Sequence, residues 1–258
     1  MDMTHFNAEK TRDNLVQWIV DWFEQNGKDK LAVLGISGGK DSTIVAALCA
    51  RAIGAERVFG VMMPNGQQKD IGDSIRVCEA LGIPNIVVNI ADGYRGISDN
   101  VEACLAGSAA GYKELSDQAL VNLAPRLRTA TLYAISQTVG GRVINTSNKS
   151  EYMTGYFTRW GDECGDCKPL INLLKSEVVA IGLTMPEIPR DLVEKAPSDG
   201  LTDKTDEDNI GFSYDALDNY LRLHRGDPEV DKQIEKRIAE TAFKRKPVPA
   251  FDPWHKED

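Results

Sequence analysis

Residues 31–43, which read LAVLGISGGKDST, decide the fold of this chain. The apolar run 31–36 is short, continuous and closed by a glycine pair, a pattern typical of a buried strand. From Asp41 onward the apolar residues recur at helical spacing, and this pattern stops at Gly54. The stretch therefore predicts a strand, a glycine loop and a helix in succession.

The predicted loop is suited to binding an anion. The first turn of a helix leaves backbone N–H groups unpaired, and the aligned peptide dipoles place partial positive charge there. Gly38 and Gly39 let the backbone approach a phosphate closely, and Lys40 adds a positive charge. Asp41 would repel a bare phosphate, but it becomes useful if it holds a magnesium ion that the phosphates also bind. The loop therefore predicts a site for a metal-bound pyrophosphate.

The loop differs from the two most familiar nucleotide-binding signatures. It lacks the longer glycine loop of a Walker A sequence, and it lacks the GxGxxG of dinucleotide-binding folds. Its order SGGxDS/T is instead similar to the pyrophosphate loop of ATP pyrophosphatases, which adenylate a substrate and release pyrophosphate. A plain turn before an amphipathic helix would need only the glycines, so we favour the functional interpretation.

Length and charge narrow the class of protein. A chain of 258 residues can bury one large core. Its 30 Lys and Arg against 39 Asp and Glu give a net charge of −9, and an acidic chain binds nucleic acid poorly. No apolar run approaches the roughly 18–20 residues of a membrane helix, and the N-terminus lacks a signal-peptide pattern. We expect a cytoplasmic protein without nucleic-acid or membrane partners.

Strands alternate with helices in the first part of the chain. Residues 58–63 read as a second strand, a helix is expected over 71–81, and a third strand over 85–90. Such alternation implies βαβ units and a sheet covered on both faces. We therefore predict an α/β fold with a doubly wound, mostly parallel sheet, formed as a single domain over residues 1–258.

The remainder of the chain is less regular. Residues 91–111 show a weak apolar pattern and are predicted to be an irregular connection. A long helix is expected over 115–139, broken or bent near Pro125. Two further helices are expected around Leu217 and Ile234, which lie in segments with helical apolar spacing.

Glu151 is a candidate partner of Asp41. It follows a short predicted strand at 143–145, so it should face the same crevice as Asp41 at the carboxyl ends of the strands. It could be a second magnesium ligand. It could equally be a carboxylate that stabilises the start of a helix through the dipole, and position alone leaves both interpretations open.

Several further segments occur in one order along the chain. They are MPNGQQKD at 63–70, PRLRTATLY at 125–133, INTSNKSEYMTGYFTRWGD at 144–162, KAPSDGL at 195–201, DEDNIGFSYDALD at 206–218 and KRKPVP at 244–249. Together with SGGKDST they resemble the ammonia-dependent NAD synthetases, members of the N-type ATP pyrophosphatase superfamily with an adenine nucleotide alpha hydrolase-like fold. The resemblance implies that ATP adenylates the nicotinate carboxylate of deamido-NAD and that ammonia then displaces AMP.

The resemblance also implies a role for individual residues. ATP would be bound by Gly35, Ile36, Ser37, Gly38, Gly39, Lys40, Asp41, Ser42, Thr146, Lys175 and Ser198. Deamido-NAD would be bound by Arg126, Arg159, Asp166 and Lys244. Asp41 and Glu151 would hold Mg²⁺, and Asp41 and Lys175 would be catalytic, Lys175 by offsetting charge on the leaving pyrophosphate.

The resemblance extends to assembly and to the nitrogen donor. It implies a homodimer with the dinucleotide at the interface. A chain of 258 residues leaves no room for the glutaminase domain of glutamine-dependent relatives, so ammonia is the expected donor. Phe243 stands where a histidine is usual and Arg159 where a lysine is usual, so these contacts to the dinucleotide differ from the common pattern.

Two alternatives compete with this interpretation. A tRNA thiolase would use Cys164 and Cys167 as a sulfur or iron–sulfur feature, but the net charge and the single CxxC motif disfavour it. No nearby His or Cys completes a zinc site, so we interpret the pair as two thiols in a loop. A non-catalytic ATP-binding module would need the glycine loop but not Arg126, Glu151 or Lys175.

Overall fold

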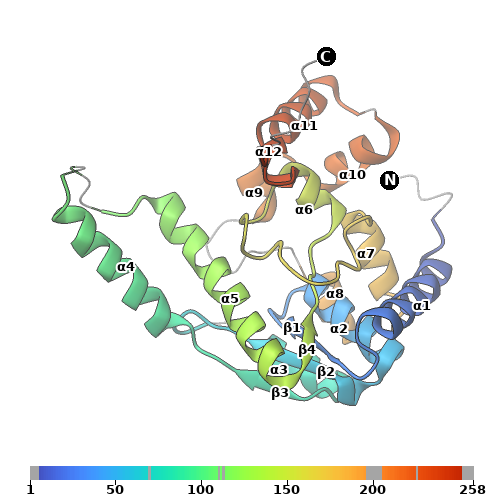
Figure 1. The fold of residues 1–258 in the computed structure, drawn as a ribbon. Coiled ribbons are helices and arrows are strands. Elements are labelled where there is room, and N and C mark those ends of the chain that lie inside the picture. The colour runs from blue at the N-terminus through green and yellow to red at the C-terminus, as the bar shows by residue number, and fades with distance from the viewer. Residues whose placement is uncertain are drawn as a thin grey trace.

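The protein is built on a four-stranded parallel sheet in the order β3-β2-β1-β4 (Figure 1). The computed structural model describes residues 6–68, 71–109, 111, 114–195, 205–224 and 226–251. The strands are β1 (Leu31–Gly35), β2 (Val58–Met62), β3 (Asn85–Val87) and β4 (Gly141–Val143). The prediction of an α/β fold with a parallel sheet is confirmed.

The central strand β1 divides its side chains between two apolar layers. Ala32 and Leu34 face the larger core, whereas Val33 faces a smaller core that it shares with Val61. Successive side chains of a strand point to opposite faces, so a continuous apolar run is what a strand buried on both faces requires. Each fully buried Val or Leu side chain contributes about 1.5–3 kcal/mol to this packing.

Helices cover both faces of the sheet. The larger core is closed by α1 (Ala8–Asn26), α2 (Lys40–Ile53), α3 (Ile71–Leu81), α7 (Lys175–Gly182) and α8 (Arg190–Glu194), and the short 3-10 helix η1 (Ala55–Arg57) leads into β2. The smaller core is closed by α5 (Asp117–Val139), with α4 (Ala91–Ala106) beside it. The predicted doubly wound arrangement is therefore confirmed. Within the part of the chain that the structure describes, no helix is long and apolar enough to cross a membrane.

The C-terminal helices form a separate cluster over the short helix α6 (Lys149–Thr154), seen in red at the top of Figure 1. They are α9 (Asp206–Ile210), α10 (Tyr214–Leu223), α11 (Pro228–Glu240) and α12 (Ala242–Arg245). Leu217 and Ile234 are fully buried in a third apolar core, and both expected helices around them are present. This cluster is joined to the rest of the protein mainly through α6 and α7.

The prediction that residues 91–111 are an irregular connection is wrong over most of the segment, because Ala91–Ala106 form helix α4. Its main neighbour is α5, and Ile97 and Val101 stay 42% and 38% exposed. Its apolar residues Tyr94, Ile97, Val101 and Leu105 do recur at helical spacing, but the glycines among them, Gly93 and Gly96, are typical of loops and obscured the pattern.

Three other boundaries differ from the prediction. Helix α5 runs without interruption through Pro125, so the predicted break is wrong. β3 ends at Val87, although the N–H groups of Val88 and Ile90 still donate to the carbonyls of Met62 and Pro64. β4 ends at Val143, and Ile144 makes a single bridge to Cys167 outside the four strands.

Candidate functional site

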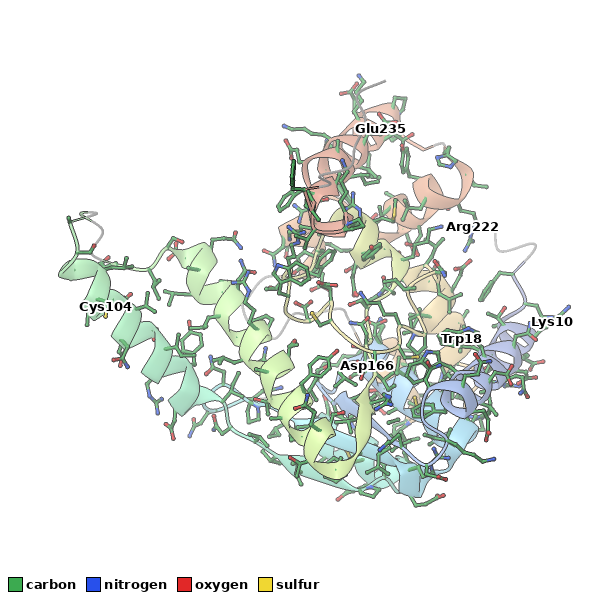
Figure 2. All side chains as sticks on the ribbon, viewed as in Figure 1. Lys10, Trp18, Cys104, Asp166, Arg222 and Glu235 are labelled. Carbon is green, nitrogen blue, oxygen red and sulfur yellow. The ribbon has the colours of Figure 1, made fainter. Side chains whose placement is uncertain are left out.

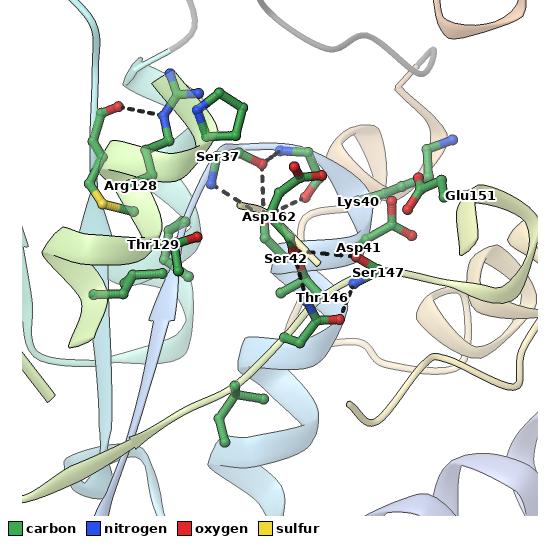
Figure 3. Close-up of a pocket in the computed structure, with 18 of the residues that line it drawn as sticks. Ser37, Lys40, Asp41, Ser42, Arg128, Thr129, Thr146, Ser147, Glu151 and Asp162 are labelled. Atoms are coloured by element: carbon green, nitrogen blue, oxygen red, sulfur yellow. Dashed lines mark hydrogen bonds between the residues drawn. The ribbon is translucent and has the colours of Figure 1, made fainter. Parts of the chain in front are cut away.

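A cavity of about 350 Å³ opens at the carboxyl ends of the central strands (Figure 3). Most residues expected to bind ATP line it: Gly35, Ile36, Ser37, Gly39, Lys40, Asp41, Ser42, Thr146 and Lys175. Gly38 lies in the same loop, and Ser198 lies outside the described residues. Parallel strands end at one edge of the sheet, which is why residues from separate segments meet there.

The glycine loop is held in shape by its own hydroxyl groups. The N–H of Gly39 donates to Ser37 Oγ at 3.2 Å, and the Ser42 hydroxyl donates to the carbonyl of Gly39 at 3.1 Å. Gly38 adopts φ +76°, a conformation that glycine accepts without strain. No side chain caps the start of α2 at Gly39, so the first-turn N–H groups are available to an anion.

Lys175 lies between the two carboxylates expected to bind magnesium. Its Nζ is 2.6 Å from Asp41 Oδ2 and 2.8 Å from Glu151 Oε1. The lysine side chain is 7% exposed, and each carboxylate side chain is 17% exposed. Burial alone would lower the pKa of Lys175, but the attraction of Asp41 and Glu151 outweighs it and raises that pKa.

Glu151 takes the helix-start role that the sequence left open, and its carboxylate also reaches the pocket, where the magnesium role stays a prediction. One oxygen accepts the Lys175 ammonium in the pocket, and the other accepts the N–H of Asn148 at 3.4 Å. The Asn148 side chain accepts the N–H of Glu151 in return, which completes a capping box at the start of α6. The cap fixes the backbone of Glu151, and its carboxylate still reaches the pocket.

The paired carboxylates suit a hard cation such as Mg²⁺, which prefers oxygen ligands. Across the described ranges, no group of three or more His, Cys, Asp or Glu side chains is placed to hold a metal by itself. Mg²⁺ in nucleotide sites is commonly bound by one or two carboxylates together with substrate phosphates and waters. Asp41 and Glu151, next to an anion-binding loop, match that donor set.

Arg128 and Thr129 line the end of the pocket opposite Glu151 (Figure 3). The Nε of Arg128 donates to the carbonyl of Met63 at 3.0 Å, and burial lowers the pKa of its guanidinium. Pro125 and Leu132 add an apolar wall. Sequence reasoning gave these residues no role, although PRLRTATLY places an arginine among apolar neighbours on the inner side of a helix.

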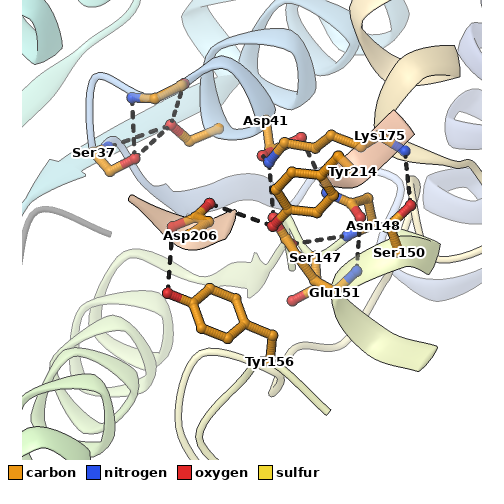
Figure 4. Close-up of polar contacts among 12 residues, drawn as sticks. Ser37, Asp41, Ser147, Asn148, Ser150, Glu151, Tyr156, Lys175, Asp206 and Tyr214 are labelled. Carbon is orange, nitrogen blue, oxygen red and sulfur yellow. Dashed lines mark hydrogen bonds and ion pairs between the residues drawn. The ribbon is translucent and has the colours of Figure 1, made fainter. Parts of the chain in front are cut away.

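Acidic and aromatic residues close the pocket from the side of the C-terminal helices (Figure 4). Asp206 is buried and accepts the hydroxyl groups of Tyr156 and Tyr214, each at 3.3 Å. Asp162 also lines the pocket, and burial raises the pKa of its carboxyl group. Sequence reasoning named none of the four as a site residue: Tyr156 and Asp162 lie in the loop after α6, and only the chain fold brings Asp206 of α9 and Tyr214 of α10 close to them.

The residues expected to bind deamido-NAD do not line this cavity. Three of them gather on the segment after α6: Lys244 Nζ donates to the carbonyls of Gly155 and Phe157, both at 2.7 Å, and Arg126 Nε donates to the carbonyl of Arg159 at 3.3 Å. Arg126, Arg159 and Lys244 border the pocket, because the segment after α6 that they contact also contains residues that line the pocket.

Arg159 sits between exposed aromatic rings. Its guanidinium lies 4.9 Å from the ring of Trp160 and 5.9 Å from the ring of Phe243. Both rings are more than half exposed. Phe243 therefore packs against Arg159, so the two positions expected to depart from the family pattern form one contact.

Asp166, the fourth residue, lies beside β4 (Figure 2). One carboxylate oxygen accepts the N–H of Val143 at 2.8 Å, and the other accepts the hydroxyl of Tyr133 at 3.2 Å. The first contact satisfies a backbone N–H of β4, and the second joins Asp166 to helix α5. These contacts give Asp166 a structural role that the sequence did not predict.

Comparisons with known proteins agree on a family. A family model described as NAD synthase matches residues 11–248. The NH(3)-dependent NAD(+) synthetase of Pyrococcus furiosus is 39% identical over 220 residues, which cover 85% of this chain and 79% of that protein. The NMN synthetase structure from Francisella tularensis has a TM-score of 0.85 at 29% identity, covering 96% of this chain and 99% of that one. The NH3-dependent NAD synthetase structure from Campylobacter jejuni has a TM-score of 0.74, also at 29% identity, covering 96% and 100%.

Proposed function

The chain belongs to the NAD synthase family, and from this premise we propose that it is an ammonia-dependent NAD synthetase. It uses ATP to amidate deamido-NAD through an acyl-adenylate, with NAD, AMP and pyrophosphate as products. The observation that carries the proposal is the buried group of Asp41, Lys175 and Glu151 beside an uncapped helix start in one cavity. Neither alternative, a tRNA thiolase or a non-catalytic ATP-binding module, explains both the family match and the arrangement of the site residues.

In the first step the carboxylate of deamido-NAD attacks the α-phosphorus of ATP. A C–O–P linkage forms, the bond to the bridging oxygen breaks, and pyrophosphate leaves. The N–H groups of the glycine loop bind the phosphates, while Lys40 and Lys175 offset the charge that develops on the leaving group. Orientation and charge stabilisation suffice, so no covalent bond to the protein is required.

Mg²⁺ would be held by Asp41 and Glu151, and it would neutralise phosphate charge and orient the leaving pyrophosphate. The capping box at Asn148 keeps the Glu151 backbone in place while its carboxylate serves this role. The side-chain amide of Asn148 is also 3.4 Å from Asp41 Oδ1. Both carboxylates are thus oriented by the same asparagine.

In the second step ammonia attacks the acyl carbon, a C–N bond forms and AMP leaves. The nitrogen must lose one proton. Asp162 is a suitable acceptor because its carboxyl group lines the pocket and burial raises its pKa above the usual range of an aspartate. Arg126, Arg159 and Lys244 are the cations proposed to bind the far part of the dinucleotide.

We also propose that two copies of the chain assemble in the cytoplasm as a homodimer. Apolar side chains on α1, α4 and α5, among them Trp18, Val101 and Val121, are 38–46% exposed and would supply interface area. Ammonia is proposed as the donor because the curated relative from Pyrococcus furiosus bears the name NH(3)-dependent. We propose that residues 1–258 form one synthetase domain.

A second candidate is the amidation of nicotinate mononucleotide to NMN. It is supported by the TM-score of 0.85 with the NMN synthetase from Francisella tularensis, against 0.74 with the NAD synthetase from Campylobacter jejuni at equal identity and coverage of this chain. The cavity chemistry would be unchanged, because only the part of the substrate remote from the nicotinate differs. The ratio of kcat/KM for deamido-NAD and for nicotinate mononucleotide separates the two functions.

The decisive experiment mixes the protein with ATP, Mg²⁺, ammonium and each acid substrate, and follows amide, AMP and pyrophosphate. Equal amounts of the three products, dependent on ammonium and absent with glutamine, support the proposal. Asp41→Ala and Glu151→Ala should lower kcat by about 100-fold or more and keep the fold. Asp191→Asn, which removes an exposed carboxylate paired with Arg76, is the matched control and should keep full activity. Absence of amide formation with both substrates would refute the proposal.

A further inference from the structure

Asp218 is a buried carboxylate that the proposed mechanism does not use. It lies on α10, is 0% exposed and does not line the cavity. Its Oδ1 accepts the hydroxyl of Ser150, and its Oδ2 accepts the backbone N–H of Ser176 at 2.8 Å. A buried carboxylate is tolerated only when hydrogen bonds satisfy it, and here both bonds go to other helices.

The two partners of Asp218 are the immediate neighbours of Glu151 and Lys175. Ser150 Oγ also accepts the backbone N–H of Lys175 at 3.0 Å, a contact drawn in Figure 4. The N–H groups of Lys175 and Ser176 belong to the first turn of α7 and have no partner within their own helix. One carboxylate therefore ties the start of α6 to the start of α7.

The same face of α10 also contacts the far end of the Lys175 side chain. Tyr214 stands four residues before Asp218, so the two side chains lie on one side of the helix. The ring of Tyr214 lies 5.2 Å from Lys175 Nζ, at a distance suited to a cation–π contact. Helix α10 thus constrains the lysine both at its backbone and at its ammonium group.

We propose that Asp218 is a positioning residue for the reaction, because it holds α6 and α7 at the spacing that brings Glu151 and Lys175 to one point in the pocket. The inference rests on the proposed function. Asp218 acts through Ser150 and Ser176 and touches neither substrate. A shift of about 1 Å in the positions of reacting groups can lower the rate about 100-fold. Loss of the two Asp218 hydrogen bonds should therefore slow the chemical step.

The test compares three variants. Asp218→Ala removes the tie, Asp218→Asn keeps an oxygen that can accept the Ser176 N–H, and Arg222→Gln is the matched control. Arg222 also lies on α10 and binds α7, but through Glu177 Oε1 at 2.6 Å, whereas Asp218 binds Ser150 and Ser176. Rates of adenylation, KM for ATP, thermal unfolding and Mn²⁺ affinity in the presence of ATP are measured for each.

For Asp218→Ala we expect kcat to fall by about 100-fold, with KM for ATP within about threefold of the original. Asp218→Asn should recover most of the rate, and Arg222→Gln should keep it even if it unfolds at a lower temperature. Mn²⁺ affinity should fall about tenfold in Asp218→Ala only, because the Glu151 backbone moves.

Two outcomes would overturn the inference: an Asp218→Ala variant as fast as the original protein, or an Arg222→Gln variant as slow as Asp218→Ala. If Asp218→Ala fails to fold, Ser150→Ala removes only the hydroxyl that links Asp218 to the backbone of Lys175. Unchanged kcat and Mn²⁺ affinity in that variant would equally overturn the inference. A failure of the original protein to form amide at all would instead refute the proposed function, and Mn²⁺ affinity would still test the role of Asp218.

Discussion

The ammonium nitrogen of Lys175 lies 2.6 Å from Oδ2 of Asp41, and the same nitrogen is 2.8 Å from Oε1 of Glu151. The lysine therefore occupies the position between the two carboxylates and neutralises charges that burial would otherwise make unfavourable. A divalent cation bound by the same oxygens would repel the ammonium group. We expect Lys175 to turn toward the phosphates when Mg²⁺ and ATP bind together.

Lys175→Met should therefore strengthen metal binding and weaken catalysis. Without nucleotide, Mn²⁺ affinity measured by electron paramagnetic resonance should rise by about tenfold, because the competing cation is gone. The rate of adenylation should fall by about 100- to 1,000-fold, because charge on the leaving pyrophosphate is no longer offset. Lys168→Met, which removes an ion pair with Glu163 outside the cavity, is the control. Unchanged Mn²⁺ affinity in Lys175→Met would show that the lysine does not compete with the metal.

Metal binding should depend on pH through Glu151. Burial raises the pKa of this carboxyl group to about 7. Below that pH the group carries a proton and is neutral, so Mn²⁺ affinity should fall by about tenfold for each unit of pH and should level off above pH 7. Glu151→Gln should bind weakly at every pH. A wild-type affinity that is constant from about pH 5.5 to about pH 8.5 would contradict the assignment.

Gly38→Ala should distort the phosphate loop. The position has φ +76°, and a Cβ there would lie 3.0 Å from Asp73 Cβ and 3.1 Å from the backbone nitrogen of Ser74. We expect a loss of about 1–3 kcal/mol in the free energy of unfolding and a fall in ATP affinity of about tenfold or more, measured by calorimetry. Gly66→Ala shares the positive φ, at +82°, but has open space around it, so it should keep its ATP affinity. Equal ATP affinity in the two variants would count against a role for the Gly38 backbone.

Asp166→Ala should lower stability more than substrate affinity. The change leaves the N–H of Val143 without its acceptor, which costs about 1–3 kcal/mol in the free energy of unfolding. Asp166→Asn should cost less, because an amide oxygen can still accept that bond. Urea unfolding and KM for deamido-NAD are measured together. A large rise in KM with unchanged stability would restore the substrate-binding role expected from the sequence.

Alkylation should distinguish Cys164 from Cys104. Cys104 lies exposed on α4 at the edge of the molecule (Figure 2), whereas Cys164 lines the cavity and burial raises the pKa of its thiol. Iodoacetamide followed by mass spectrometry should label Cys104 first and Cys164 slowly, since the thiolate is the reactive form. ATP should slow labelling of Cys164 alone. Labelling of Cys164 that ATP leaves unchanged would place the nucleotide elsewhere.

Local patterns predicted the strand, loop and helix at the centre of the fold. The stretch 31–43 could be interpreted from its own residues, because a strand covered on both faces must be apolar throughout and a phosphate loop must contain glycine. Helix α4 was missed although Tyr94, Ile97 and Val101 recur at helical spacing, because the glycines within the segment are typical of loops. The approach of Glu151 to the crevice followed from the rule that parallel strands end at one edge.

The sequence by itself determined the order of the four strands, the glycine loop after the first of them and the residue types available for phosphate and magnesium chemistry. Only the tertiary structure decided which of them meet: Lys175 contacts Asp41 across 134 positions of the chain, and Asp218 binds Ser150 across 68. The physical reason is that periodicity and turn chemistry act over a few residues, whereas these contacts depend on how separate helices pack. The same packing engages Asp166 with β4 and sets Asp218, which no local pattern distinguishes, at the junction of α6 and α7.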